Sequence, residues 1–375
     1  MAGLLHSLLL DLKRRGQFVL KELGALETTL PGNFDTHRTE AAERIKRAIG
    51  VVGHMLMDPD LANPHLEPNF FIVFKRLSEL IVNIEDQSLL ILKRCSPEDQ
   101  FLSALLKQIC EEVKYPDPPP LCGALSFQYF QALIDMDIIV TPQTQAGEML
   151  ALPDLYHELA HFIVFRQRAI LEARLLGVIH KSFTGALRRG RQQGLPEAAL
   201  KSIEDNYELW KGFWHVEFAC DMIAAFWCGP AYGWANLRLS ATRGDPYEDS
   251  ATHPADDARR AGIACILRLV GDNKAADEID RMWEDLKRLS PSAKPSGYTK
   301  RYPGRLLEEA GQCIYQLCVD LGFRRYSEQQ RNGAMVGCAV TGAWAAFQRD
   351  AAAFPAHEAS TLQALRAKMP GILLK

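Results

Sequence analysis

One stretch of the chain guides the interpretation of the rest: Leu152-Pro153-Asp154-Leu155-Tyr156-His157-Glu158-Leu159-Ala160-His161-Phe162-Ile163. It contains the pattern His-Glu-x-x-His, in which the two histidines are four residues apart. Residues at that spacing share one face of a helix, so His157 and His161 can direct two imidazoles at one metal ion. Glu158 lies beside that face, where a carboxylate can act as a general base on water. The stretch therefore predicts a helix that carries part of a zinc site.

The residues around the motif favour a buried helix. Leu155, Leu159 and Phe162 recur at helical spacing, and Pro153 and Asp154 are typical of a helix start. A short motif also arises by chance, and the alternative interpretation is an ordinary amphipathic helix that happens to carry two histidines.

Composition sets the broad class of protein. The chain has 375 residues, of which 47% are hydrophobic and 24% charged, the balance of an ordinary globular protein. Its net charge of -3 gives no general attraction to nucleic acid, and we expect no nucleic-acid partner. No apolar run reaches the roughly 18 residues of a membrane-spanning helix, so no span is expected. Nine cysteines without a Cys-x-x-Cys pair indicate reduced thiols and a cytoplasmic location.

Helical periodicity dominates the chain, which predicts a mainly α fold with at most a short edge strand or small sheet. A proline cluster at 114–120 is the best candidate for a domain boundary. We expect an N-terminal helical domain over 1–115, a catalytic domain over 116–270 and a C-terminal helical region over 271–375. Residues 137–142 form the clearest predicted strand, either an edge that pairs with an extended peptide or a buried connector.

A catalytic zinc site needs a third protein ligand and one open position. Glu217 lies in a strongly apolar helix predicted to begin near residue 196, where a carboxylate is costly unless it is paired or binds a metal. Asp221 shares its face and could hold the outer N–H of a ligand histidine. His215 competes for the ligand role, but it lies on a different face from Glu217. A solvated Glu/Asp pair on the helix surface is the ordinary alternative.

A third group follows in the segment Thr252-His253-Pro254-Ala255-Asp256-Asp257-Ala258-Arg259-Arg260. Proline and two aspartates fit the start of a helix, which leaves His253 at its tip and an arginine inside it. Both side chains could donate hydrogen bonds to the oxyanion that forms when water attacks an amide. The alternative is a helix cap with surface arginines.

Together, the three motifs resemble those of the gluzincin metallopeptidases, with the heat-shock and CAAX-prenyl zinc endopeptidases as the most similar pattern. The resemblance covers about residues 135–265 and implies a multi-helical zincin-like core. It implies that His157, His161 and Glu217 bind Zn²⁺. It also implies that Glu158 is the base and that Asp221 supports a ligand.

The resemblance further implies that His253 and Arg259 contact the oxyanion or the substrate, with Arg260 as the alternative to Arg259. Two departures stand out. Those relatives are commonly embedded in membranes, and the second proline common after their histidine is Ala255 here. The substrate class therefore does not carry over.

These observations predict a soluble zinc-dependent metalloendopeptidase that hydrolyses peptide bonds of a protein or peptide substrate. The alternative is a helical binding or scaffold protein that keeps a structural zinc site. A further alternative is a regulatory protein, such as a stress or phage-defence component, whose proteolysis is latent until a partner protein arrives.

Overall fold

The structure is a computed structural model that describes residues 4–26, 30–126, 129–145 and 147–369. It is mostly helical and contains one small sheet within these ranges, which confirms the predicted mainly α fold. None of the described helices is both long enough and apolar enough to cross a membrane.

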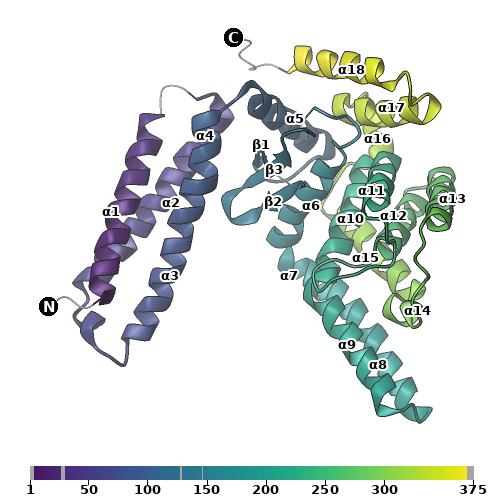
Figure 1. The fold of residues 1–375 in the computed structure, drawn as a ribbon, viewed down its shortest axis with the longest axis horizontal. Helices are drawn as coiled ribbons and strands as arrows, with labels where there is room; N and C mark the ends of the chain where they lie inside the picture. Colours follow the sequence, from purple (N-terminus) through teal and green to yellow (C-terminus); the bar gives the residue numbers. More distant parts are fainter. Residues whose placement is uncertain (1–3, 27–29, 127–128, 146, 370–375) are drawn as a thin grey trace.

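A three-helix bundle forms the N-terminal part of the molecule and stands beside the remainder (Figure 1). Its third helix is interrupted by a π-helical turn at Ile84–Leu89. Leucines, isoleucines and valines at helical spacing fill the bundle, as the periodicity of the sequence predicts. The helices are α1 (Leu4–Ala25), α2 (Gly32–Met57), α3 (Glu67–Asn83) and α4 (Leu90–Arg94).

Helix α5 (Pro97–Val113) leads from the bundle to the sheet. Ser96 accepts a hydrogen bond from the Asp99 backbone N–H, and the Asp99 carboxylate accepts one from the Ser96 N–H, so a capping box starts this helix. Although α5 lies within the N-terminal domain predicted over 1–115, its apolar residues pack in the core of the larger body. The predicted domain boundaries stay a prediction.

The sheet has three strands, β1 (Leu121–Ser126), β2 (Gln131–Leu133) and β3 (Ile138–Pro142), in the order β1-β3-β2. The predicted strand is the central one, β3, which pairs parallel with β1 and antiparallel with β2. All five residues of β3 are buried, so β3 is the buried connector of the two alternatives, and the edge strands of the sheet are β1 and β2.

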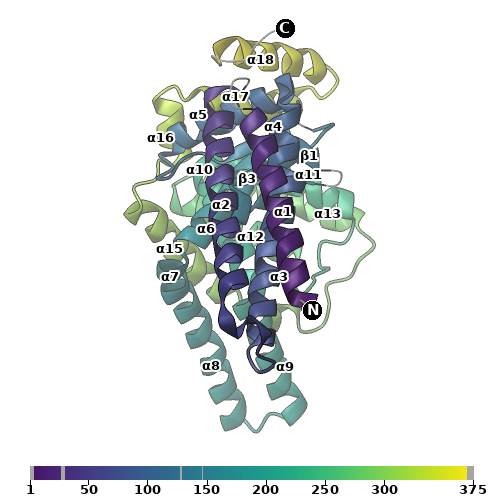
Figure 2. The same ribbon diagram turned by 90° about the vertical axis from the view of Figure 1, so that its left-hand side faces the viewer.

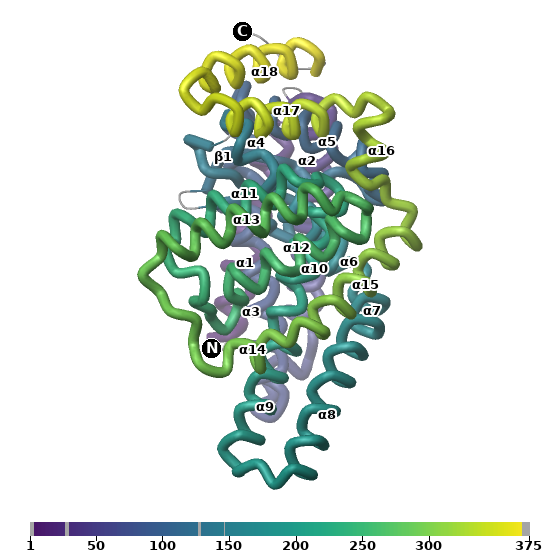
Figure 3. The backbone as a smooth tube through the Cα atoms, turned by 90° about the vertical axis from the view of Figure 1, so that its right-hand side faces the viewer, coloured from purple at the N-terminus to yellow at the C-terminus, as the bar shows by residue number. Residues whose placement is uncertain are grey.

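The zinc-motif helix α6 (Asp154–Arg166) lies against the sheet and packs on α10 (His215–Cys228). Between them, the chain runs out and back as a helical hairpin that projects from the body (Figures 1 and 3). The outgoing arm is α7 (Arg168–Leu171), a π turn and α8 (Gly177–Gln192). The returning arm is α9 (Glu197–Leu209), followed by a second π turn at Trp210–Trp214.

The remaining helices surround α10. Helix α11 (Pro230–Arg243) follows Gly229, whose φ of 66° is easily adopted only by glycine. Helix α12 (Asp256–Leu269) packs on α10, and helices α17 and α18 lie at the end of the molecule near α5 (Figures 2 and 3). The other elements are α13 (Asn273–Leu289), α14 (Tyr298–Arg301), α15 (Gly304–Asp320), α16 (Tyr326–Arg331), α17 (Met335–Arg349) and α18 (Phe354–Lys368).

Candidate metal centre

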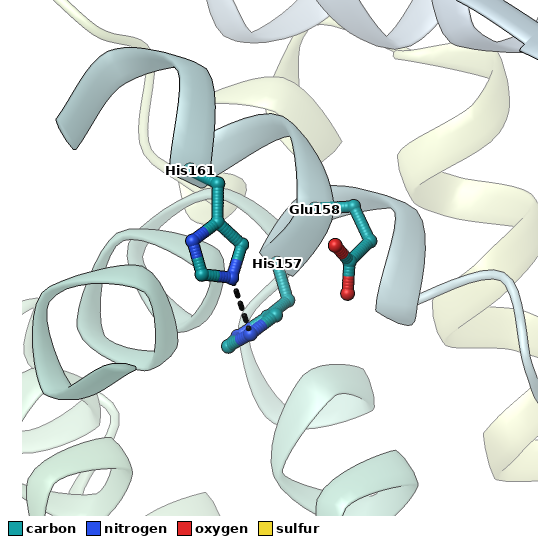
Figure 4. A group of neighbouring side chains, drawn as sticks. All are labelled: His157, Glu158 and His161. Atoms are coloured by element: carbon teal, nitrogen blue, oxygen red, sulfur yellow. Dashed lines mark hydrogen bonds between the residues drawn. The ribbon is translucent and has the colours of Figure 1, made fainter. Parts of the chain in front are cut away.

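Three predicted ligands converge where α6 meets α10. The Nε2 atoms of His157 and His161 are 3.2 Å apart (Figure 4). Glu217 approaches both: Oε2 lies 3.6 Å from Nε2 of His157 and Oε1 lies 3.8 Å from Nε2 of His161. Two donors bound to one tetrahedral Zn²⁺ are roughly 3.3 Å apart, given metal–nitrogen distances of about 2.0–2.1 Å. The side chains therefore fit one such ion with little movement.

Glu158 supplies a second carboxylate at the same place. It lies on the side of α6 that carries both imidazoles (Figure 4), and one ligating atom from each of these three residues falls within 4.8 Å of the others. Its carboxylate is held by the backbone N–H of Ala132 on β2, and burial raises the pKa of Glu158 to about 7. Glu217 fits the predicted place of a third ligand better than Glu158, because its oxygens face both imidazoles whereas Glu158 is tied to the sheet edge.

Asp221 organises the far side of the cluster. It is fully buried, and its Oδ1 lies 3.0 Å from Nδ1 of His157. A hydrogen bond from Nδ1–H to this carboxylate leaves Nε2 free to bind a metal. Arg259 holds the same carboxylate with two hydrogen bonds of 2.7 Å. Burial alone would raise the pKa of Asp221, but the charge of Arg259 keeps it well below its usual range.

The two imidazoles have opposite proton affinities. Burial lowers the pKa of both, but hydrogen bonds with Asp221 and Glu217 raise that of His157 to about 10. The pKa of His161 falls to about 4 through burial and the charge of His157. Without an ion, the cluster therefore holds a proton on His157, and metal binding at Nε2 must displace that proton.

The predicted third motif lies beside these donors. Nε2 of His253 is 4.0 Å from Oε2 of Glu217, and its half-exposed ring can reach a ligand in the cleft. Arg259 is buried, with Nη2 3.9 Å from the same Glu217 oxygen. Because its guanidinium is committed to Asp221, this geometry favours a positioning role for Arg259 over direct substrate contact.

The two alternative residues lie in different surroundings. Arg260 forms ion pairs with Asp257 and Asp280, so it belongs to the contact between α12 and α13. The Nδ1 of His215 donates a hydrogen bond to the carbonyl of Trp210, 3.0 Å away in the preceding turn. Neither residue replaces its predicted counterpart.

Two residues of α11 complete the site, and no sequence pattern pointed to either of them. The hydroxyl of Tyr232 donates to Asp221 and lies 3.0 Å from Nδ1 of His157. Asn236, one turn further along, is 2% exposed and lines the cleft. Its Oδ1 receives no hydrogen bond from the described part of the chain. A buried acceptor without a partner is costly, so Asn236 is available to hold a bound ligand.

A cleft of about 920 Å³ opens over the cluster. One wall is β2 and the adjoining loop, the other is formed by α6, α10 and α11, and Asp86, Gln87 and Leu90 of the bundle's third helix close one side. Because β2 is an edge strand, its outer side faces this space. An extended peptide could therefore lie along β2 and pass over the donors.

Comparison with known proteins found no matching family model, no matching curated protein and no matching solved structure.

Proposed function

We propose that this protein is a zinc-dependent metallopeptidase that hydrolyses peptide bonds of a protein or peptide substrate. The observation that carries the proposal is the convergence of His157, His161 and Glu217 on one point at the floor of an open cleft. Buried charges of this kind destabilise a fold unless they are paired or bind a metal. Glu158 lies beside these three residues as a buried carboxylate that is hydrogen-bonded to β2 and can serve as a general base.

The side chains divide the chemistry between them. A bound Zn²⁺ would polarise the substrate carbonyl and lower the pKa of water. Glu158 would take a proton from the attacking water and deliver it to the leaving amine. Burial supports this role, because a base whose pKa is about 7 can both accept and return a proton near neutral pH. His253, beside Glu217, would donate a hydrogen bond to the developing oxyanion.

The remaining residues keep the donors in place. Asp221 orients His157, while Arg259 and Tyr232 hold Asp221. The outer edge of β2 would align the substrate backbone, and Asn236 would receive one of its N–H groups. All nine cysteines are free thiols, which supports a cytoplasmic location.

The substitution Glu158→Gln tests this function. The zinc-loaded full chain and its Glu158→Gln variant are incubated with a mixture of proteome-derived peptides, and new peptide ends are counted by mass spectrometry. We expect Glu158→Gln to lower the cleavage rate by at least roughly 10²–10⁴-fold while zinc stays bound, because the amide cannot take the proton. Glu111→Gln, on the exposed side of α5, is the matched control and should cleave normally.

Two results would contradict the proposal. One is wild-type protein with a full complement of zinc that produces no new peptide ends. The other is a Glu158→Gln variant that cleaves as fast as the wild type, since hydrolysis would then come from a contaminant or another site.

A further inference from the structure

Two exposed phenylalanines flank the candidate metal centre. Phe165 follows His161 by four residues on α6, and Phe213 precedes Glu217 by four residues. Phe165 shares a face of α6 with His161, and Phe213 lies in the π turn that leads into α10, so each ring lies about one turn beyond a metal donor. Their exposed fractions are 53% and 60%, and both rings lie outside the set of residues that line the cavity. Clustered exposed apolar residues mark binding surfaces.

The packing of α6 on α10 places both rings at the same end of the cleft. His157 contacts Asp221, and His161 approaches Glu217. Moving four residues toward the C-terminus of α6 therefore corresponds to moving four residues toward the N-terminus of α10. The helices are therefore antiparallel, and the next step in the series pairs Phe165 with Phe213.

The end of β2 adds further apolar residues to this end of the cleft. Leu133 and Ile134 line the cavity, together with Leu90 of the bundle. Asp137, which follows shortly after Ile134, forms an ion pair with Arg166, the neighbour of Phe165. The C-terminal ends of β2 and α6 thus lie together. At the opposite end, the cavity is lined by Asp154, Asn236 and Arg243 together with the apolar Leu239.

The direction of β2 decides which part of a substrate meets the apolar end. Its neighbour β3 pairs with one edge, and the Ala132 N–H points from the other edge to Glu158. The Ala132 N–H already binds the Glu158 carboxylate, so a peptide at this edge would pair through the Ala132 carbonyl. Antiparallel pairing would be favoured, because it is the more stable arrangement per residue. Since β2 runs toward the C-terminal end of α6, such a peptide would enter with its N-terminal part beside Phe165 and Phe213.

We propose that the enzyme selects substrates with large apolar side chains on the N-terminal side of the cleaved bond. One or two such side chains of an extended segment then bind at the apolar end. An unfolded protein or an exposed apolar tail would supply such a segment. This inference rests on the proposed function, because it assigns the substrate class of the same site.

Cleavage and binding test the inference separately. Two peptides are compared that differ only in carrying phenylalanine or serine at the residues before the cleaved bond, and kcat/KM is measured for each with the zinc-loaded full chain. We expect the phenylalanine peptide to be favoured by roughly 10–100-fold, the range that follows from burying one large apolar side chain. In the Phe165→Ser/Phe213→Ser variant this ratio should fall close to one.

The matched control is Phe18→Ser, which removes an equally exposed phenylalanine from α1 in the bundle, and it should keep the wild-type ratio. Binding of the same two peptides is measured by fluorescence anisotropy with the zinc-loaded Glu158→Gln variant. The phenylalanine peptide should bind at least about tenfold more tightly, and the double serine substitution in that background should remove the difference.

The outcomes separate the two proposals. Cleavage without preference, or with a preference for apolar residues after the bond, would overturn the inference and leave the peptidase function standing. Equal binding of the two peptides would overturn it even if no peptide is cleaved. Tighter binding of the phenylalanine peptide without any cleavage would support the apolar subsite and contradict the proposed activity.

Discussion

The N-terminal bundle and the α6–α10 pair are both built from packed helices, but they bury different kinds of side chain. In the bundle, Leu9, Ile45 and Ile81 are completely buried, and the periodicity of apolar residues accounts for the packing. The α6–α10 pair instead encloses a cluster of charged and titratable groups, namely His157, Glu158, Glu217, Asp221 and Arg259. A stable bundle needs no such groups, and burying them costs stability unless they are paired or bind a metal.

The largest expected effect comes from removing the carboxylate at the centre of the charged cluster. Asp221→Ala leaves the buried Arg259 without its partner and frees Nδ1 of His157. We expect the free energy of unfolding to fall by about 3–5 kcal/mol, as is typical when one member of a buried ion pair is lost. Denaturant unfolding of the zinc-free chain measures it.

The exposed pair between Asp277 and Arg268 provides the control for this substitution. Asp277→Ala should change stability by less than about 1 kcal/mol, because solvent screens surface ion pairs. If the two variants were equally stable, the charged cluster would not be energetically distinct from the surface.

The bundle has a buried histidine of its own, which predicts a separate response to acid. Nε2 of His37 lies 3.2 Å from Oγ of Ser88, and burial lowers the pKa of His37 to about 4. Its unfolded value is about 6.5, so the unfolded chain binds the proton first and stability falls as the pH drops from 6.5 to 4. The expected loss is up to about 3 kcal/mol, at 1.36 kcal/mol per unit of pKa difference.

Amide hydrogen exchange in α2 across this pH range measures that loss. His37→Gln should flatten the pH dependence, whereas His54→Gln, at an exposed position of the same helix, should leave it as in the wild type. An unchanged slope in His37→Gln would show that another group controls the acid response.

Zinc should stabilise the α6–α10 pair but not the N-terminal bundle. At a free concentration about 100 times the dissociation constant, a ligand specific for the folded state adds about 2.7 kcal/mol. Hydrogen exchange should therefore slow in α6 and α10 when zinc is added, with little change in α1 to α3. His161→Ala should remove the effect, and zinc protection spread evenly over both regions would contradict the assigned site.

The smallest expected effect concerns Asn236, whose Oδ1 has no partner among the described residues. Asn236→Leu should raise KM about tenfold, because the substrate loses one hydrogen bond, while kcat changes less. The free energy of unfolding should stay the same or rise, because a buried unpaired acceptor is removed. A marked loss of stability with unchanged KM would make Asn236 a structural residue.

Much of the helical architecture could be predicted from local patterns. The capping box at Ser96, the break at Gly229 and the spacing of apolar residues are all encoded within one or two turns of chain. The His157/His161 pair belongs to the same class of signal, because both residues lie on one helix. Glu217 and Asp221 stood out as carboxylates in an apolar helix.

The remainder of the site depends on packing between distant segments. Tyr232 and Asn236 lie in a helix of ordinary composition, and only the packing of α11 places them near His157 and the cleft. Strands β1 and β2 were not predicted because their pairing with β3 is non-local and β2 is only three residues long. The commitment of Arg259 to Asp221 likewise depends on how α12 packs against α10.

The central claim is that Glu217 joins the two histidines as a metal ligand. Zinc content and affinity measured by native mass spectrometry on the full chain test it most directly, with Glu217→Ala and Glu158→Gln compared to wild type. We expect one zinc ion per wild-type and Glu158→Gln chain, and a loss of affinity in Glu217→Ala beyond the roughly 10–100-fold typical of outer partners. Wild-type affinity in Glu217→Ala, or loss of zinc from Glu158→Gln instead, would contradict this assignment.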